Sequence, residues 1–263
     1  PFAQHPTFLK LAELPLPELV VELRKPEVKQ QILGEKTGYL EDVPFYYDVA
    51  HGFDKIYPLG DNPEYEPAPE DSMAARAKQA GRDPYEFTYD ELLEREGKAL
   101  LFMAVSEYSD HSLDPLWERM QRDDCVVSLS DAGAHARSIC DASSTTYLLT
   151  HWARDRKRGP KLSLEYVVKL QAHDTARLYG FLDRGVIKPG YRADLNVIDF
   201  EGLRLHAPEM TYDLPGGGAR LLQPVDGYRA SVVAGEITFE NGRHTGALPG
   251  KLLRGPQPAP AGV

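Results

Sequence analysis

The stretch CVVSLSDAGAH, residues 125–135, carries the strongest indication of fold in this chain. Its first part, Cys125–Leu129, is short, apolar and β-branched, which is typical of a buried parallel strand. Asp131 follows this run, and Gly133 beside it permits a tight turn. Catalytic residues of (β/α)₈ barrels lie at the carboxyl ends of strands, so Asp131 is a candidate catalytic carboxylate. An aspartate that only caps the following helix would leave the same local pattern.

Composition narrows the class of protein. The chain has 263 residues, of which 42% are hydrophobic, as expected for a globular protein. Its formal net charge of −10 disfavours nucleic acid and anionic membrane surfaces as partners, which leaves small molecules or other proteins. Two cysteines are too few for a disulfide framework and are typical of a reduced, cytoplasmic protein. We find no apolar run near the roughly 20 residues that a membrane span needs.

The number of strand candidates is too small for a complete barrel. Three apolar runs of strand length precede the Asp131 turn: Phe45–Val49, Ala99–Val105 and Cys125–Leu129. A barrel needs eight such strands, and the first residue is Pro1 rather than Met. We therefore expect the chain to be the C-terminal part of a longer protein. A helix predicted over Asp114–Arg122 would bring the ends of the last two strands to one rim, together with His111.

Helical patterns occupy much of the chain before residue 180. Prolines divide residues 8–33 into short amphipathic helices, and further helices are predicted over Ser72–Ala80 and Tyr89–Glu96. Between them, residues 61–71 combine prolines with acids and should form an exposed loop. After the Asp131 turn, a helix with the apolar face of residues 147–152 is followed by one that starts near Ser163 as N-cap. His151 and His173 lie in these helices, where a structural role is expected.

Beyond residue 180 the pattern changes to short strands and glycine turns. We predict a strand and turn over Gly185–Gly190 and a strand over Ala193–Phe200. A hairpin of Tyr228–Val233 and Glu236–Glu240 should close at Asn241-Gly242. The three glycines at 216–218 lack the lysine of a phosphate-binding loop and read as a flexible connection. Residues 255–263 are rich in proline and should be a disordered tail.

Three segments resemble the amidohydrolase superfamily. The first is DRGVIKPGYRADLNVID, residues 183–199, and its order of glycines, proline and acids is similar to a long motif of that superfamily. The second and third are LSDAGAH, residues 129–135, and THWARDR, residues 150–156, which look most like the N-acyl-D-amino-acid deacylase (D-aminoacylase) branch. The likeness covers about residues 97–254 and is weaker before them.

The resemblance implies a fold and a cofactor. Its fold is a (β/α)₈ TIM-like barrel that binds one or two divalent metals, usually zinc, with a small β-sandwich made from both chain ends. We therefore expect an α/β protein: residues 1–183 as the C-terminal part of the barrel, 184–254 as part of the sandwich, and 255–263 as the tail. The family's aspartate at the end of the eighth strand maps onto Asp131, which would take a proton from a metal-bound water, pass it to the leaving nitrogen, and in some members touch the metal.

The metal ligands that the family uses do not map onto this chain. The superfamily's His-x-His, its bridging residue and its two further histidines all precede the catalytic aspartate, and none of the eight histidines here has that spacing. A catalytic zinc site needs three protein ligands, so we expect them in an upstream segment of the same protein. His135 is a candidate contact of substrate or ligand, or a turn residue, and Arg137 a candidate partner of the substrate carboxylate.

These observations lead to three hypotheses. The first is hydrolysis of a linear amide, most simply of an N-acyl-D-amino acid, by the intact protein. The second is hydrolysis of a cyclic amide or lactone, because superfamily members share the barrel and differ in its loops. The third is that the chain alone is an inactive fragment, or a subunit that depends on another polypeptide for its metal ligands. Oligomerisation is compatible with each of them.

Overall fold

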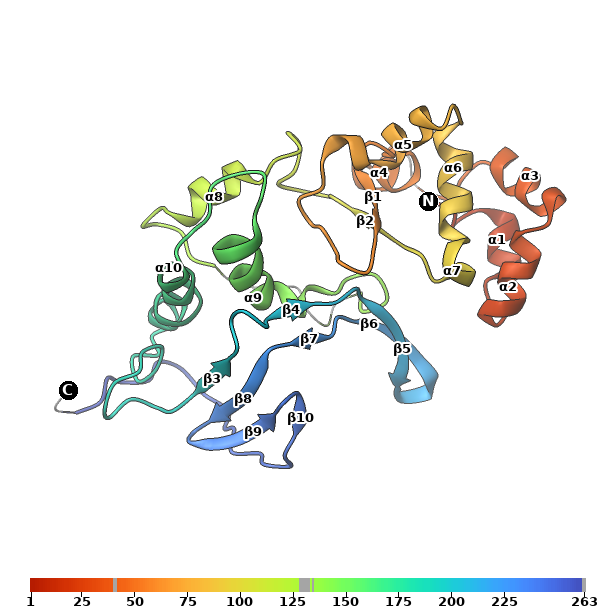
Figure 1. Ribbon diagram of the computed structural model, residues 1–263. Coiled ribbons are helices and arrows are strands. Elements are labelled where there is room, and N and C mark those ends of the chain that lie inside the picture. The colour runs from red at the N-terminus through yellow and green to blue at the C-terminus, as the bar shows by residue number, and fades with distance from the viewer. Residues whose placement is uncertain (40–41, 128–132, 134, 262–263) are drawn as a thin grey trace. The chain divides into compact units, whose positions relative to one another are not determined.

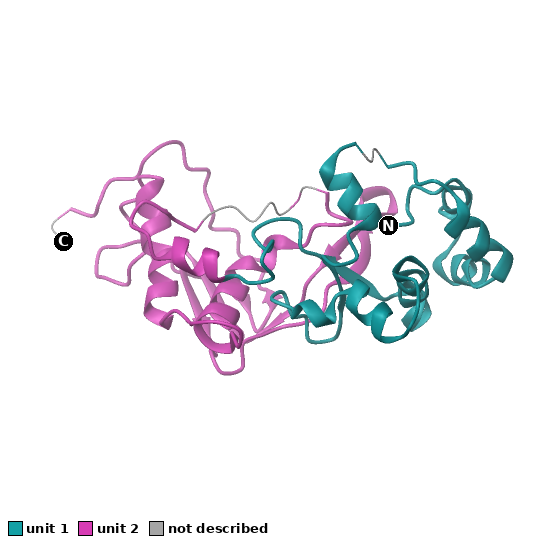
Figure 2. Cartoon of the chain, turned by 90° about the horizontal axis from the view of Figure 1, so that it is seen from above, with its two compact units in different colours: residues 1–113 teal, residues 114–263 magenta. Residues whose placement is uncertain are grey.

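The computed structural model describes residues 1–39, 42–127, 133 and 135–261, and Figure 1 shows the course of the chain. It divides into two compact units, residues 1–113 and residues 114–263 (Figure 2). Helices and strands occur together, so the protein belongs to the mixed α/β class that the sequence predicts. Among the described residues, no helix has the length and apolar character needed to cross a membrane.

The first unit is mainly helical and contains a small sheet. Strands β1 (Ile56–Leu59) and β2 (Leu100–Met103) pair antiparallel, with Tyr57 opposite Phe102. A 3₁₀ turn lies at Pro69–Asp71. The helices are α1 (Pro6–Leu11), α2 (Leu16–Leu23), α3 (Pro26–Gly34), α4 (Pro44–His51), α5 (Met73–Gln79), α6 (Pro84–Leu92) and α7 (Glu94–Gly97).

Prolines begin several of these helices, because the first turn does not use the amide hydrogen that proline lacks. Helix α6 illustrates this. The carboxylate of Asp83 accepts hydrogen bonds from the next two free amides at 2.9 and 3.0 Å, and Pro84 opens the helix. The predicted start at Tyr89, with Asp90 near the N-terminus, is therefore wrong by about one and a half turns. The Asp-Pro pair supplies both the cap and the fixed φ angle that a helix start needs.

Two other local predictions have opposite outcomes. Helix α5 confirms the prediction over Ser72–Ala80, and the Ser72 hydroxyl accepts the amide hydrogen of Ala75 at 3.2 Å. The strand predicted over Phe45–Val49 is wrong, since these residues lie in helix α4. Aromatic and β-branched residues favour strands only when a pleated neighbour is available, and here Pro44 starts a helix instead.

The strand predicted over Ala99–Val105 exists as β2, but its partner differs from the one expected. A barrel strand has parallel neighbours, whereas β2 pairs antiparallel with β1. Of the run Cys125–Leu129, the structure describes Cys125, Val126 and Val127, and these three form no strand. Each multi-residue ladder between described strands is antiparallel. The barrel is thus not visible in the described residues and stays a prediction.

The acidic segment 61–71 has an irregular backbone up to residue 68, as predicted, but its middle is buried. Glu66 is only 2% exposed, and its carboxylate accepts the amide hydrogen of Leu113 at 3.0 Å. The hydroxyl of the buried Tyr108 donates to the carbonyl of Pro67. These bonds hold the segment against the protein, which composition alone did not indicate.

The apolar core of the first unit has two parts. Phe2, Leu23, Ile32 and Tyr89 form one cluster, in which Ile32 is fully buried. Phe53, Ile56 and Met73 form the other. Tyr85 packs against both clusters, so α6 joins them.

The second unit begins with helices. Helix α8 (Asp114–Met120) confirms the prediction for that segment, and a 3₁₀ turn at Asp141–Ser143 leads into the next helix. Ser163 caps α10 through its hydroxyl, 3.2 Å from the amide nitrogen of Tyr166, as predicted. The remaining helical segments are α9 (Ser144–Tyr147) with π-helical turns over Leu148–Asp155, and α10 (Leu164–Lys169) with π-helical turns over Leu170–Asp174 and α11 (Thr175–Leu178).

Short antiparallel strands make up the rest of this unit. The four-stranded sheet has the order β10-β9-β8-β3, and β4 pairs with β7 and β5 with β6. The hairpin of β8 and β9 is confirmed, but it closes at Ala234-Gly235, whereas Asn241-Gly242 joins β9 to β10. Both turns have positive φ at both residues, as tight hairpins need. The strands are β3 (Leu195–Ile198), β4 (Arg204–Leu205), β5 (Glu209–Leu214), β6 (Gly218–Leu222), β7 (Val225–Asp226), β8 (Tyr228–Val233), β9 (Glu236–Glu240) and β10 (Arg243–His244).

Two segments near this sheet differ from expectation. Residues 185–190 form no strand, and Ile187 is 90% exposed, so its apolar side chain has no sheet to pack against. In the predicted tail, the Gln257 amide donates to the Gly180 carbonyl, and its carbonyl accepts from Leu182, each at 2.9 Å. Backbone pairing of this kind gives residue 257 a defined partner where the composition indicates disorder.

Candidate active-site segment

The candidate catalytic residue Asp131 lies outside the described residues. The structure describes the chain on either side of it, up to Val127 and again at Gly133 and from His135 onward. Gly133 has φ +94°, a conformation that favours glycine, in agreement with the turn expected there. Residues on both sides of the segment 128–134 form hydrogen bonds to other elements of the second unit.

A side chain from helix α11 holds the upstream end. The hydroxyl of Thr175 lies 3.0 Å from the carbonyl oxygen of Val127 and 2.9 Å from that of Leu170. A hydroxyl has one hydrogen, so it is shared between these two acceptors. This bond links Val127, four residues before Asp131, to a helix that begins 48 residues further along the sequence.

A charged pair lies just before this anchor. Arg122 forms an ion pair with Asp124 at 2.6 Å, and both side chains are mainly exposed. The hydrogen bond from Arg122, with its positive charge, lowers the pKa of Asp124 to about 2. Because both groups are in water, the pair contributes little to stability. Asp124 therefore stays ionised at neutral pH but has no buried surroundings that would suit proton transfer.

Strand β6 holds the downstream end. The amide nitrogen of Leu221 donates to the carbonyl oxygen of Ala136 at 2.7 Å. Just before it, the carbonyl of His135 accepts from the amides of Ser138 at 2.8 Å and Ile139 at 3.0 Å. The chain from His135 to Ile139 is thus a hydrogen-bonded turn that is attached to strand β6.

The two candidate substrate-binding residues lie in this turn. His135 has φ +46°, a left-handed conformation that is uncommon for residues other than glycine, and its side chain is exposed. Arg137 is also exposed, and no described residue forms an ion pair or hydrogen bond with its guanidinium. Both side chains are therefore accessible to a ligand. Their roles in binding substrate stay predictions.

A polar cluster in the second unit was not predicted from the sequence. Its members are Ser143, His206, Gln223 and Asp226. The hydroxyl of Ser143 donates to the side-chain carbonyl of Gln223, whose amide nitrogen donates to the His206 backbone carbonyl at 2.9 Å. The imidazole of His206 lies 2.7 Å from the Asp226 carboxylate. Although a serine, a histidine and an aspartate occur together, the serine is bonded to Gln223 and not to the imidazole, so this is not a nucleophilic triad. Only pairing of β4 with β7 brings His206 and Asp226 together, which no sequence signal indicates.

His151 and His173 lie in helical segments, as predicted. His151 is 7% exposed and stacks on Tyr147 with ring centroids 4.5 Å apart, next to the buried Trp152. His173 contacts the carboxylate of its neighbour Asp174 at 2.8 Å. Neither position has a second potential metal ligand beside it in these contacts.

The described residues do not fit a metal site. No three His, Cys, Asp or Glu side chains in this part of the chain come together in a group that could hold an ion. His173 and His206 each meet a single carboxylate, whereas a catalytic zinc needs three protein ligands. Asp131, the one ligand that the resemblance offers, lies outside the described residues.

The sequence matches a known protein family. Residues 2–239 match the pattern that defines the Amidohydrolase family, Amidohydro_3. Among the curated proteins none matches.

Solved structures of D-aminoacylase are also similar. One, described as defining a novel subset of amidohydrolases, is 22% identical with a TM-score of 0.38 and aligns with 73% of this chain. A D-aminoacylase mutant in complex with copper chloride is 21% identical with a TM-score of 0.38 and aligns with 76% of this chain. At these TM-scores the likeness does not establish a common fold. This chain spans only 36% and 37% of the length of these two structures.

Proposed function

Because the chain belongs to the amidohydrolase family, we propose that the protein hydrolyses a linear amide and releases the acyl group of an N-acyl-D-amino acid. The family match over residues 2–239 carries the proposal, because it includes the Asp131 segment and the motif at residues 183–199. The choice of a D-amino acid rests on the resemblance of residues 129–135 and 150–156 to the deacylase branch.

Asp131 has the chemistry that amide hydrolysis needs. A carboxylate can accept a proton from the attacking water and deliver it to the leaving nitrogen, and such proton transfer contributes roughly 10²–10⁴-fold in rate. The anchors at Val127 and Ala136 support this role, since both flanks of the segment have hydrogen bonds to other elements. Arg137 is proposed to pair with the substrate carboxylate, and His135 to contact the substrate.

A divalent metal, zinc in the simplest case, would polarise the amide carbonyl when bound. The described residues supply no group of three ligands, so we propose that the ligands come from elsewhere in the protein, with Asp131 as a possible addition. The part of the protein that provides them would then be an obligatory partner of this chain.

A substrate panel tests the proposal. The full-length protein is incubated with N-acyl-D-amino acids, their L-enantiomers, cyclic amides and lactones, and released carboxylate and amine are measured. We expect turnover of the linear D-substrates. Turnover of cyclic amides or lactones alone would replace the proposal with the second hypothesis of the sequence analysis. No turnover of any of them by the metal-loaded protein would favour a non-catalytic chain.

A further inference from the structure

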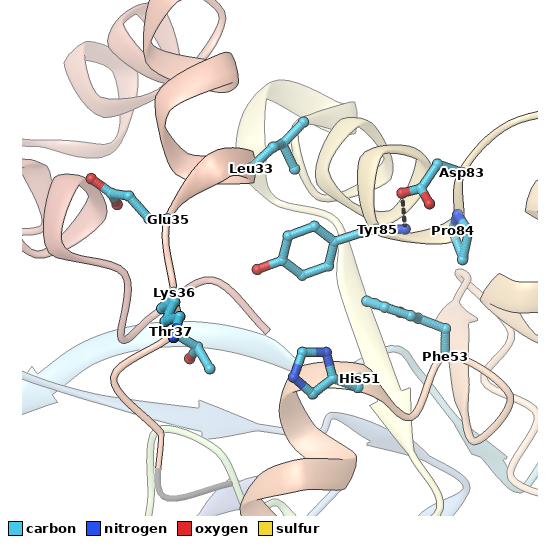
Figure 3. A pocket seen from close by; sticks show the side chains of 9 residues that line it. All are labelled: Leu33, Glu35, Lys36, Thr37, His51, Phe53, Asp83, Pro84 and Tyr85. Carbon is cyan, nitrogen blue, oxygen red and sulfur yellow. Dashed lines mark hydrogen bonds between the residues drawn. The ribbon is translucent and has the colours of Figure 1, made fainter.

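The first unit contains a pocket that the proposed function does not use. It has a volume of about 510 Å³ and lies among the end of α3, the chain that follows it, the end of α4 and the start of α6 (Figure 3). Small-molecule sites in proteins have volumes of about 300–1,000 Å³. The pocket therefore has room for a ligand the size of a small organic acid.

One wall of the pocket is aromatic and fixed in place. Phe53 is 7% exposed, and its ring meets that of Tyr85 edge to face, with centroids 5.7 Å apart. The Tyr85 hydroxyl lies 2.6 Å from Nε2 of the fully buried His5. Because both rings are held by other contacts, a ligand ring could pack against them with little reorganisation.

The two carboxylates at the pocket already have donors. Glu35 accepts hydrogen bonds from the amide of Thr7 at 3.0 Å and from its hydroxyl at 2.5 Å. Asp83 caps helix α6 through the amides of Tyr85 and the residue after it. Neither acid therefore depends on a cationic ligand to satisfy it.

Two side chains that directly follow Glu35 in the chain still have hydrogens to donate. In the described part of the chain, no hydrogen bond or ion pair involves the ammonium of Lys36, which lies at the pocket. Thr37, its neighbour, accepts the amide hydrogen of Tyr39 at 3.2 Å, and this leaves the hydroxyl hydrogen available. An ammonium and a hydroxyl next to each other suit the two oxygens of a carboxylate.

We propose that this pocket binds a small carboxylate that carries an aromatic ring. Lys36 and Thr37 hold the carboxylate, and the ring packs against Phe53 and Tyr85. This site goes beyond the proposed hydrolysis, because binding here requires neither Asp131 nor a metal. Its failure and the failure of the proposed function are therefore separate outcomes.

Binding of phenylacetate to the full chain tests the site. We expect millimolar or tighter binding by NMR titration, with the largest backbone shifts at Thr37, Phe53 and Tyr85. Phenylacetamide, which lacks the charge, and acetate, which lacks the ring, should each bind at least about tenfold more weakly. Absence of binding, shifts confined to other residues, or equal affinity for phenylacetamide would overturn the proposal.

Substitutions of two lysines sharpen the test. Lys36→Gln should weaken phenylacetate binding by about tenfold and leave that of phenylacetamide unchanged. Lys10→Gln is the control, because this exposed lysine lies on α1 and is not part of the pocket lining. If the two variants bind phenylacetate with the same affinity, Lys36 does not hold the carboxylate and the site is not as proposed. Circular dichroism of both variants verifies that the helices are intact.

Discussion

The hydroxyl of Tyr85 lies 2.6 Å from Nε2 of His5, 80 residues earlier in the chain. His5 precedes helix α1 and is fully buried, and Tyr85 stands in the first turn of α6. Their bond therefore connects the start of α1 to the start of α6, and it also holds the Tyr85 ring in the aromatic wall of the pocket.

Tyr85→Phe should destabilise the protein by about 1–3 kcal/mol, because it leaves the buried imidazole without its partner while the ring packing is kept. Urea denaturation followed by circular dichroism measures the change. Tyr46→Phe serves as the control, since Tyr46 is 38% exposed, and we expect a change below about 0.5 kcal/mol. Equal effects of the two substitutions would show that the hydroxyl of Tyr85 contributes nothing specific.

The stability of the protein should fall as the pH is lowered through about 6.5. Burial lowers the pKa of His5, and the Glu35 carboxylate opposes part of this shift. A histidine whose pKa is lower in the folded state binds a proton more readily when unfolded. The contribution of His5 to the free energy of unfolding is therefore complete above the unfolded pKa near 6.5. It is lost progressively as the pH falls below that value.

Unfolding free energies measured from pH 8 to pH 5 test this pH dependence. His5→Gln should flatten the slope, whatever its effect on stability at pH 8, because glutamine does not titrate. The exposed His244 provides the comparison, and His244→Gln should keep the slope. A slope that persists in His5→Gln would assign the pH dependence to other groups.

Asp131→Asn should lower the turnover rate of the full-length protein at least about 10²-fold, because an amide cannot accept the proton. Steady-state kinetics on the best substrate of the panel measures the loss. Asp124→Asn changes another carboxylate of the same stretch, one that is exposed and paired with Arg122, and should leave turnover within about twofold. Near-normal turnover of Asp131→Asn would remove this residue from the mechanism.

Thr175→Val should destabilise the second unit by about 1 kcal/mol, since it removes the hydroxyl that bonds Val127 and keeps the side-chain shape. Hydrogen exchange at the amide of Cys125, which donates to Arg122 at 3.3 Å, should become faster. Thr175→Ser retains the hydroxyl and should retain the slow exchange. If valine and serine behave alike, the bond to Val127 does not anchor the segment.

Local signals predicted those parts of the fold that depend on a few neighbouring residues. Ser72 and Ser163 cap the helices that follow them, and the hairpin of β8 and β9 occupies its predicted residues, because caps and hairpin strands are short-range features. Prediction was wrong where the pattern was ambiguous. Residues 45–49 are apolar enough for a strand or a helix. Helix α6 has two possible starts in its sequence, and it begins after the Asp83-Pro84 pair and not at the predicted Tyr89.

Pairings between distant segments had no signal in the sequence. The sequence did not indicate that β2 would find β1 as an antiparallel partner, that Glu66 would be buried, or that His206 would meet Asp226. Each depends on which segments meet once the chain is compact, and residues that are 20 to 47 apart carry no local mark of such contacts.

The sequence by itself determined the family, because its motifs at residues 129–135 and 183–199 consist of residue types in a fixed order that a single chain displays directly. It also determined which residue is the candidate acid and base. Tertiary structure alone decided how both sides of that residue are held, with Val127 bonded to Thr175 and Ala136 to Leu221. Tertiary structure also formed the pocket beside Tyr85, because a site made from the ends of three helices exists only when packing brings those ends together.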